Sequence, residues 1–284
     1  MKKRAKAVSP KPTVGFIGGG NMATALIRGL ISAGLCDAGK IIASDVDSAK
    51  RAALKRRLRV NTTEDNRAVV ARAKVIFLAV KPQIIDEVLN GVRAEVKPGK
   101  LFISIAAGVP TARLERGLGP QARVVRVMPN TPALLAQGMS VIVRGTRATA
   151  ADERLALKLF RAVGHAVAVH EEALLDPVTG LSGSGPAYVY LFAEGLIAGG
   201  IAAGLPPQLA QELTYQTLAG AAAMLQRTGE TPERLRAQVT SPGGTTLAGL
   251  TELDARGFKE AAGAAVVTAS RRSQELGRAR QICG

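Results

Sequence analysis

The chain has 284 residues, of which 47% are hydrophobic and 21% charged, and its formal net charge is +16. This composition is typical of a globular protein with one large or two smaller domains, and it excludes a disordered chain or a disulfide-stabilised miniprotein. The two cysteines, Cys36 and Cys283, lie far apart and show neither metal-binding nor redox spacing, so we expect a cytoplasmic protein.

Two segments bear on membrane targeting. Residues 1–11 are basic but contain no apolar run of the length that a secretory signal needs, so we expect a flexible tail. Residues 187–205 are apolar, yet Glu194 and several glycines interrupt them. Soluble helices in close contact use small residues in the same way, so we expect a buried helix and no membrane partner.

Charge is distributed unevenly along the chain. Residues 1–170 carry a balance of +18 and residues 171–284 a balance of −2, so an anion is expected to bind the first part. Aromatic residues make up only 3% of the chain, and tryptophan is absent. Stacking platforms for bases are therefore not evident, and a phosphate-bearing small molecule is expected rather than nucleic acid.

Short β-rich segments alternate with helical patterns from Thr13 to His170. Apolar residues recur at helical spacing over 23–33 and 47–58, and Pro82 precedes a further helical segment at 84–92. The expected strands are 14–18, 41–44, 75–80, 101–106, 124–128, 140–145 and 166–170. This alternation predicts an α/β domain over residues 12–170, with a mostly parallel, doubly wound sheet.

The strand pattern stops after Glu171. Long stretches rich in alanine, leucine and glycine follow, and proline- and glycine-containing breaks separate them. The expected helical stretches are 173–204, 207–227, 231–239 and 245–276. They predict an all-α domain over residues 171–284.

The segment 14–30, VGFIGGGNMATALIRGL, places Gly18, Gly20 and Ala23 between an apolar strand and an amphipathic helix. Gly18 permits a tight turn, Gly20 lets the backbone approach a pyrophosphate, and Ala23 keeps the helix close to the sheet. Because the strand and helix context accompanies the glycine pattern, the segment predicts dinucleotide binding.

The end of the second expected strand bears on which dinucleotide binds. Asp45 at this position favours the ribose hydroxyls of NAD and repels a 2′-phosphate. Ser44, Lys50 and Arg51, together with the positive balance of this half, favour the more anionic NADP. Both cofactors therefore stay open.

Three further segments follow expected strands and so belong to the sheet edge where doubly wound folds bind ligands. Lys81 follows 75–80, and the other two segments are 106–109 and 128–133. Their small residues and prolines would let a flat nicotinamide ring approach, although each segment taken alone could equally be a turn.

The segment Ser241-Pro242-Gly243-Gly244-Thr245-Thr246 opens an expected helix of the second half. Hydroxyl groups, free backbone N–H groups and the positive end of a helix dipole suit a carboxylate. His165 and His170 have no carboxylate or cysteine at catalytic spacing, so we expect a structural role for them. The sequence shows no cluster of metal ligands, and no metal is expected.

These motifs together resemble the pyrroline-5-carboxylate reductase family. The resemblance rests on GFIGGGNMA (15–23), LAVKPQ (78–83), MPNTPA (128–133) with TGLSGSGPAY (179–188), and VTSPGGTT (239–246). It implies a Rossmann-type amino-terminal domain, an all-α dimerisation domain, and the reduction of 1-pyrroline-5-carboxylate to L-proline by NADPH or NADH, the final step of proline biosynthesis. The imine nitrogen can enter charged or take a proton from a hydroxyl or water, so no histidine is required.

The resemblance also implies roles for particular residues. The pyrophosphate turn would be lined by Gly18, Gly20, Asn21 and Met22, and the adenosine side by Ser44 and Asn66. The nicotinamide end would be surrounded by Val80, Lys81, Pro82, Ala107, Gly108 and Asn130. The substrate carboxylate would be held by Ser241, Gly243, Gly244, Thr245 and Thr246, with the Thr246 hydroxyl as the catalytic partner of the ring nitrogen.

The resemblance has departures and consequences for assembly. Many relatives carry an acidic residue where this chain has Ala237-Gln238, and the basic tail is not part of the family pattern.

The family implies a homodimer with interleaved carboxyl-terminal helices, and decamers beyond it. One alternative is a related imine or hydroxyacid reductase, but Lys259 is the sole lysine of the second half and lies past the proposed loop. A cofactor-binding protein without catalysis is another alternative.

Overall fold

The computed structural model describes residues 13–278, so the predicted tail at 1–11 lies outside the described residues. The chain divides into two compact units. One unit runs to Gly183 and takes in the chain again from Ala269, and the other is Ser184–Thr268. Helix α12 (Phe258–Arg278) is continuous and contributes to both units.

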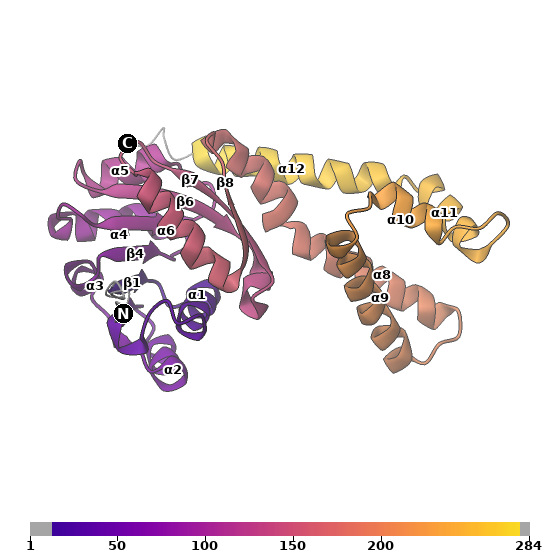
Figure 1. Ribbon diagram of the computed structural model, residues 1–284, viewed down its shortest axis with the longest axis horizontal. Coiled ribbons are helices and arrows are strands. Elements are labelled where there is room, and N and C mark those ends of the chain that lie inside the picture. Colours follow the sequence, from indigo (N-terminus) through magenta and orange to yellow (C-terminus); the bar gives the residue numbers. More distant parts are fainter. Residues whose placement is uncertain (1–12, 279–284) are drawn as a thin grey trace, which may run out of the picture. The chain divides into compact units, whose positions relative to one another are not determined.

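The first unit is built on one sheet of eight strands in the order β3-β2-β1-β4-β5-β6-β7-β8 (Figure 1). The strands are β1 (Val14–Ile17), β2 (Ile41–Ser44), β3 (Asn61–Thr63), β4 (Val75–Leu78), β5 (Leu101–Ser104), β6 (Arg123–Pro129), β7 (Gly138–Arg144) and β8 (Gly164–Ala168). Neighbouring strands run parallel except β6 and β7. The strand order changes direction between β1 and β4, which confirms the predicted doubly wound, mostly parallel fold.

The antiparallel pairing of β7 follows from the short connection that precedes it. Only residues 130–137, including the 3₁₀ turn η4 (Thr131–Leu135), join β6 to β7. A parallel neighbour needs a crossover connection of roughly a dozen residues or more, so this link can only return the chain antiparallel. Val125 consequently pairs with Arg144, which puts the start of β6 beside the end of β7.

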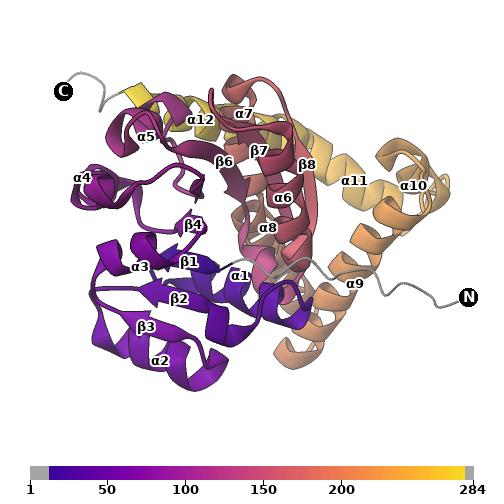
Figure 2. The same cartoon turned by 60° about the vertical axis from the view of Figure 1, so that its left-hand side comes forward.

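Helices cover both faces of the sheet (Figure 2). One face packs against α1 (Asn21–Ser32), α2 (Ser48–Leu58) and α6 (Ala150–Phe160). The other face packs against α3 (Asn66–Arg72), α4 (Ile85–Val92) and α5 (Thr111–Leu118). Because both faces are covered, strands β1, β2, β4 and β5 are buried along their whole length, as their short sequences suggest.

Large buried side chains form the core on each face. Phe16 of β1 and Phe77 of β4 stack with their ring centroids 4.5 Å apart, and Phe160 of α6 lies against Phe77. Each fully buried side chain of this size contributes about 1.5–3 kcal/mol relative to an exposed one. The sheet is therefore a rigid platform for the loops at its carboxyl edge.

Several elements differ from the sequence expectation. Strand β3 and helices α3, α5 and α6 were not predicted. The expected stretch 173–204 is broken into α7 (Leu175–Val178), a π-helical turn (Thr179–Gly183) and α8 (Gly185–Ala202), because glycines and Pro186 interrupt it. The expected stretch 245–276 is broken at Gly257, which has a φ of 65°.

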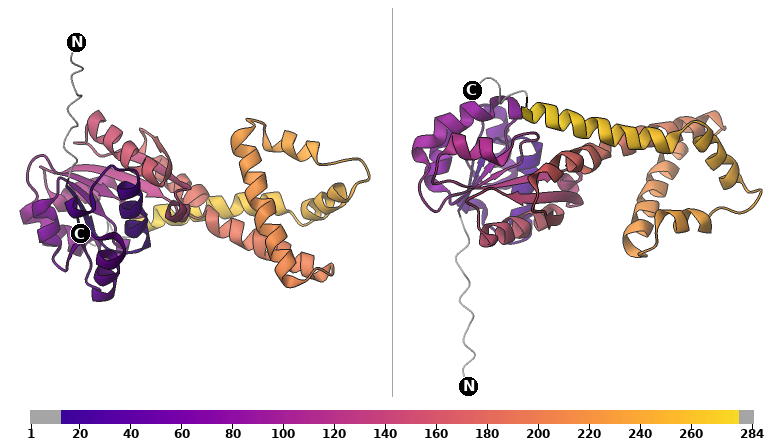
Figure 3. Two further views of the ribbon diagram at one scale, coloured as in Figure 1. Left: turned by 60° about the horizontal axis from the view of Figure 1, so that its bottom comes forward. Right: turned by 90° about the horizontal axis from the view of Figure 1, so that it is seen from above.

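The second unit contains helices and no strand within the described residues (Figure 3). Its helices are α8, α9 (Pro207–Arg227), α10 (Pro232–Gln238), α11 (Thr245–Ala255) and the first part of α12. Helix α8 packs against α9, and Phe192 contacts Phe258 with the ring centroids 5.4 Å apart. The unit also exposes many large apolar side chains, among them Leu191, Leu213, Tyr215, Met224 and Val267. None of the helices in the described part is long and apolar enough to cross a membrane.

Candidate active site

The glycine turn after β1 has the shape expected of a pyrophosphate-binding loop. Gly18 has a φ of 101°, and a Cβ there would lie 2.5 Å from the carbonyl oxygen of Ala79. Only glycine fits this close approach. A Cβ at Gly20 would meet nothing within 4 Å, and no side chain caps the helix α1 that starts directly after it. The first N–H groups of α1 are therefore available to an anion above the loop.

Ser44, at the end of β2, joins this strand to α3. Its side chain is fully buried, and its hydroxyl donates to Asn66 Oδ1 at 2.6 Å. Both residues were predicted on the adenosine side of a cofactor site. The hydrogen bond brings them together at the carboxyl edge of the sheet, beside the glycine turn.

Asp45 and Lys50 lie at the same strand end. Both carboxylate oxygens of Asp45 accept backbone N–H groups, Oδ2 from Gly19 at 2.8 Å and Oδ1 from Asp47 at 2.9 Å. Lys50 Nζ lies 3.8 Å from Asp45 Oδ2. Asp45, which favours NAD, and Lys50, which favours NADP, are thus neighbours. Two backbone amides hold the Asp45 carboxylate in the turn.

A pocket of about 290 Å³ lies above these strand ends. Its lining residues come from the carboxyl ends of β1, β2 and β4 and from the helices that follow, and they are Gly18, Gly20, Ser44, Asp45, Val46, Lys50, Asn66, Ala79, Val80, Lys81, Ile84, Glu87 and Val88. Six predicted cofactor residues share this pocket, namely Gly18, Gly20, Ser44, Asn66, Val80 and Lys81. An open sheet of this kind binds its ligand at this edge, and the residues present suit a dinucleotide.

Five lining residues were missed from the sequence, namely Val46, Ala79, Ile84, Glu87 and Val88. Val46 is 90% exposed although it is apolar, which is unusual for a residue that follows a buried strand. Ile84, Glu87 and Val88 recur at helical spacing directly after Lys81-Pro82-Gln83. That spacing indicates that the three residues share one helix face above the strand end. It was the signal from which this side of the pocket could have been predicted.

The remaining predicted cofactor residues do not line this pocket. Asn21 and Met22 open α1, and Pro82 starts the 3₁₀ turn η2 (Pro82–Ile84). Ala107 and Gly108 follow β5, and Gly108 has a φ of 69°. Asn130 follows β6, where its side chain accepts the Met139 N–H at 2.8 Å and donates to the Ser182 carbonyl at 3.1 Å. That side chain therefore fixes the backbone at the end of β6.

The predicted substrate residues lie in the second unit, around the start of α11. The turn closes through a hydrogen bond from the Gly244 N–H to the Ser241 carbonyl at 3.0 Å. Gly243 has a φ of 70°, so the turn favours glycine there. A Cβ at Gly244 would lie 2.4 Å from Ser241 Oγ and 3.2 Å from the Ser241 carbonyl oxygen, so a side chain there would require the Ser241 hydroxyl to rotate away. No side chain caps α11, and its first N–H groups are therefore available to an anion. The Thr245 and Thr246 side chains are exposed beside them.

A cavity of about 370 Å³ lies between α10 and α11 of the same unit. Its lining residues are Glu233, Arg236, Ala237, Thr240, Leu247, Leu250, Thr251 and Asp254. None of the five predicted substrate residues is among them. The anion-binding character of the segment 241–246 therefore rests on its turn and helix start, and this cavity adds nothing to it.

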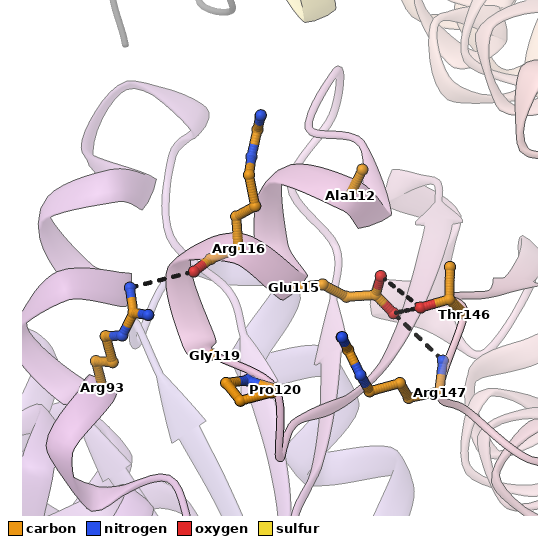
Figure 4. A pocket seen from close by; sticks show the side chains of 8 residues that line it. All are labelled: Arg93, Ala112, Glu115, Arg116, Gly119, Pro120, Thr146 and Arg147. Carbon is orange, nitrogen blue, oxygen red and sulfur yellow. Dashed lines mark hydrogen bonds between the residues drawn. The ribbon is translucent and has the colours of Figure 1, made fainter.

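Another cavity of the first unit, shown in Figure 4, lies at the amino ends of the parallel strands. Gly119 and Pro120 of its lining precede β6, and Thr146 follows the end of β7. Glu115 accepts the Thr146 hydroxyl at 2.9 Å, and Arg93 donates to the Arg116 carbonyl at 3.3 Å near the end of α5. Arginines at the carboxyl end of a helix neutralise its dipole, so Arg93 and Arg116 have a structural role at the end of α5.

The family described as pyrroline-5-carboxylate reductase dimerisation matches residues 172–276, and the family described as NADP oxidoreductase, coenzyme F420-dependent, matches residues 13–108. A pyrroline-5-carboxylate reductase of Methanosarcina acetivorans is 43% identical over 265 residues, which are 93% of this chain and 98% of the relative.

Solved structures agree with these sequence matches. The structure of a pyrroline-5-carboxylate reductase from Coxiella burnetii has a TM-score of 0.88 and 36% identity, and the match covers 95% of this chain and 100% of that one. The Plasmodium falciparum pyrroline carboxylate reductase, with NADP bound, has a TM-score of 0.85 and 31% identity, over 94% of this chain and 98% of that one.

The doubly wound sheet and the pocket above its glycine turn define a dinucleotide-dependent oxidoreductase. More specifically, the chain belongs to the pyrroline-5-carboxylate reductase family. The family and the class of enzyme predicted from the sequence are confirmed.

Proposed function

We infer that this chain reduces 1-pyrroline-5-carboxylate to L-proline with NAD(P)H as the hydride donor. The observation that carries the inference is the 43% identity to a pyrroline-5-carboxylate reductase over 93% of the chain, which spans both the dinucleotide pocket and the segment 241–246. The pocket provides the glycine turn, free helix N–H groups and polar strand ends that a dinucleotide requires.

The residue roles follow from this inference. Gly18, Gly20, Asn21 and Met22 hold the pyrophosphate with the first N–H groups of α1. Ser44 and Asn66 bind the adenosine side. The nicotinamide end is positioned by Val80, Lys81, Pro82, Ala107, Gly108 and Asn130. In support, six of these twelve residues line one pocket, and the turn at Gly18 leaves no room for a side chain.

The substrate is held by Ser241, Gly243, Gly244, Thr245 and Thr246. Its carboxylate accepts N–H groups at the start of α11, where the helix dipole adds to the hydrogen bonds. The bound cofactor supplies a hydride to the carbon of the C=N bond. The Thr246 hydroxyl donates a hydrogen bond to the ring nitrogen, or relays to it a proton that water replaces, so this side chain orients the imine and needs no shifted acidity.

We also propose how the chain is organised and where it acts. Residues 12–170 form the dinucleotide-binding domain and 171–284 the substrate-binding and dimerisation domain, although residues 171–183 and the chain from Ala269 belong to the first compact unit. The helices interleave in a homodimer that assembles further into decamers, in the cytoplasm and without nucleic acid. The match to a dimerisation family over 172–276 and the exposed apolar side chains of α8 and α9 support the dimer.

The test of the function is steady-state oxidation of NADPH and of NADH with 1-pyrroline-5-carboxylate as the acceptor. We expect substrate-dependent oxidation that yields proline, and we expect Thr246→Ala to lower kcat by about 10²-fold while cofactor binding changes little. Thr251→Ala, on the same helix, is the control and should leave kcat unchanged. Unaltered turnover of Thr246→Ala would remove Thr246 from the mechanism. The absence of substrate-dependent oxidation in the wild type would refute the function itself.

A further inference from the structure

The loop after β5 is backed by the end of helix α12. A Cβ on Gly108 would lie 3.3 Å from Leu276 Cβ and 3.5 Å from the Ser273 carbonyl oxygen. From the other side, a Cβ on Gly277 would lie 3.2 Å from the Gly108 carbonyl oxygen. The two backbones thus approach so closely that a methyl group on Gly277 would require one of them to shift by a few tenths of an ångström.

The end of α12 is itself anchored. The Ser273 side chain is only 3% exposed, and its hydroxyl donates to Asp176 Oδ1 at 2.6 Å. Asp176 belongs to α7, which lies in the same compact unit. This hydrogen bond is partly buried, and one to a carboxylate is about twice as strong as one between neutral groups, so it fixes this end of the helix against α7.

The remainder of the loop has other supports. At its far end, Glu172 accepts the Thr111 N–H at 2.8 Å and the Thr111 hydroxyl at 2.7 Å. Glu172 also pairs with the buried Arg126 of β6, with a distance of 2.9 Å. At its near end, the Ala106 N–H donates to Ser104 Oγ at 3.3 Å. Between these two anchors, the packing of α12 supports Gly108 itself.

We propose that Ser273 and Gly277 are positioning residues for the nicotinamide end of the cofactor. Ser273 anchors the end of α12, and Gly277 lets this end pack directly on the loop after β5. The packed helix end then holds the Gly108 carbonyl and the neighbouring Ala107 in place. The proposal rests on the proposed function in one respect, namely that the loop 105–110 is the nicotinamide end of the site.

The first test substitutes Gly277→Ala in the full-length chain and measures the binding of two kinds of probe. NADPH and NADH carry the nicotinamide, whereas ADP-ribose and its 2′-phosphate lack it. We expect the variant to bind the preferred reduced cofactor about tenfold more weakly and the matching fragment less than about twofold more weakly, because only the nicotinamide end is disturbed. Gly91→Ala is the matched control, since a Cβ at this helical glycine of α4 meets nothing within 4 Å.

A second test does not depend on added bulk. Ser273→Ala, Asp176→Ala and the double variant form a cycle, with Gln274→Ala, an exposed neighbour on α12, as the control. We expect each single variant to have a lower kcat and to bind the reduced cofactor more weakly, with little change in the binding of the fragment. The double variant should be no worse than the worse single variant, because both singles break the same hydrogen bond.

The outcomes separate the proposal from a merely structural role. The proposal would be overturned by any one of three results. These are an equal loss of affinity for the reduced cofactor and the fragment, additive losses of cofactor affinity in the Ser273 and Asp176 cycle, and unchanged cofactor binding in folded variants. If Gly277→Ala fails to fold, the cycle decides. The binding tests need no imine substrate, so a wild type that binds NAD(P)H but does not reduce the imine refutes the proposed function and leaves this inference standing.

Discussion

Gly18 and Gly20 lie two positions apart in one turn, yet the chain needs them for different reasons. Gly18 is required by the fold, since its φ is 101° and a side chain would collide with the Ala79 carbonyl. Gly20 has ordinary backbone geometry, with a φ of −72°, and open space above it. Its lack of a side chain matters only if a ligand comes close. Substitution can therefore separate stability from binding.

We expect Gly18→Ala to lower the free energy of unfolding by about 1–3 kcal/mol and to abolish NAD(P)H binding, because the turn is strained and displaced. We expect Gly20→Ala to unfold like the wild type but to bind the cofactor at least about tenfold more weakly, because the methyl group would occupy the proposed place of the pyrophosphate. Thermal unfolding and cofactor titration of both variants check this. Wild-type affinity in Gly20→Ala would show that the pyrophosphate lies elsewhere.

Among the elements, the end of α3 is stabilised by a single buried side chain. Lys100, directly before β5, is 8% exposed, and its ammonium donates to the carbonyls of Val70, Ala71 and Ala73. These carbonyls end the helix and would otherwise lack donors. Burial lowers the pKa of Lys100 from its ordinary value, and the nearby positive charge of Lys97 adds to this effect.

We expect Lys100→Met to lower the free energy of unfolding by about 1–3 kcal/mol without changing kcat, because several helix carbonyls lose their donor. The control is Lys97→Met at an exposed neighbour. The pH dependence has a definite sign. Since the folded-state pKa is lowered, the unfolded chain binds more protons between that pKa and the ordinary value of 10.5.

The advantage of the wild type over Lys100→Met should therefore grow as pH rises through this window and be smaller below the lowered pKa. Urea unfolding of both proteins across the alkaline range measures the difference. A difference that shrinks as pH rises would contradict the assignment.

How far the elements could be predicted depended on how strongly each one is marked in the sequence. The buried parallel strands are continuous apolar runs, so β1, β4 and β5 were found readily. Strand β3 is Asn61-Thr62-Thr63 at the edge of the sheet, where no apolar face marks it. Helix α6 was missed although its start carries a capping box formed by Thr149 and Asp152, which was a readable signal.

The candidate site was predictable in part for similar reasons. Gly18, Ser44 and Lys81 follow apolar strands, and strand ends of a doubly wound sheet converge on one edge. Val46 and Ala79 are ordinary apolar residues that no spacing marks, and only the fold shows that they line a pocket. The support of Gly108 by Gly277 depends on a contact between residues far apart in the chain, which local patterns do not encode.

At the scale of the whole molecule, most of the large exposed apolar side chains of the described residues belong to the second unit. Leu191 on α8 is 69% exposed and Leu213 on α9 is 49% exposed. Burial between two chains would remove such side chains from water, at about 25 cal/mol for each Å² of apolar surface. The proposed homodimer therefore has a clear driving force.

We expect Leu191→Glu and Leu213→Glu, singly or together, to dissociate the assembly towards a species of 29.5 kDa, the mass of one chain. A charge buried at an interface without a partner costs several kcal/mol. Size-exclusion chromatography with light scattering measures the mass. Asn90→Glu on α4 of the first unit is the control, and equal dissociation by that variant would show that charge alone is responsible.

The path of the chain through its two units also has a consequence for synthesis. The ribosome completes the sheet and the helices α1 to α6 that flank it before it makes the helical unit, but the end of α12, which packs against Gly108, is made after that unit. Until then, the loop after β5 has its two end anchors and lacks its middle one. A nascent chain can therefore form the turn at Gly18 and its pocket early, while the loop 105–110, the proposed nicotinamide end of the site, is completed only after the helical unit has been made.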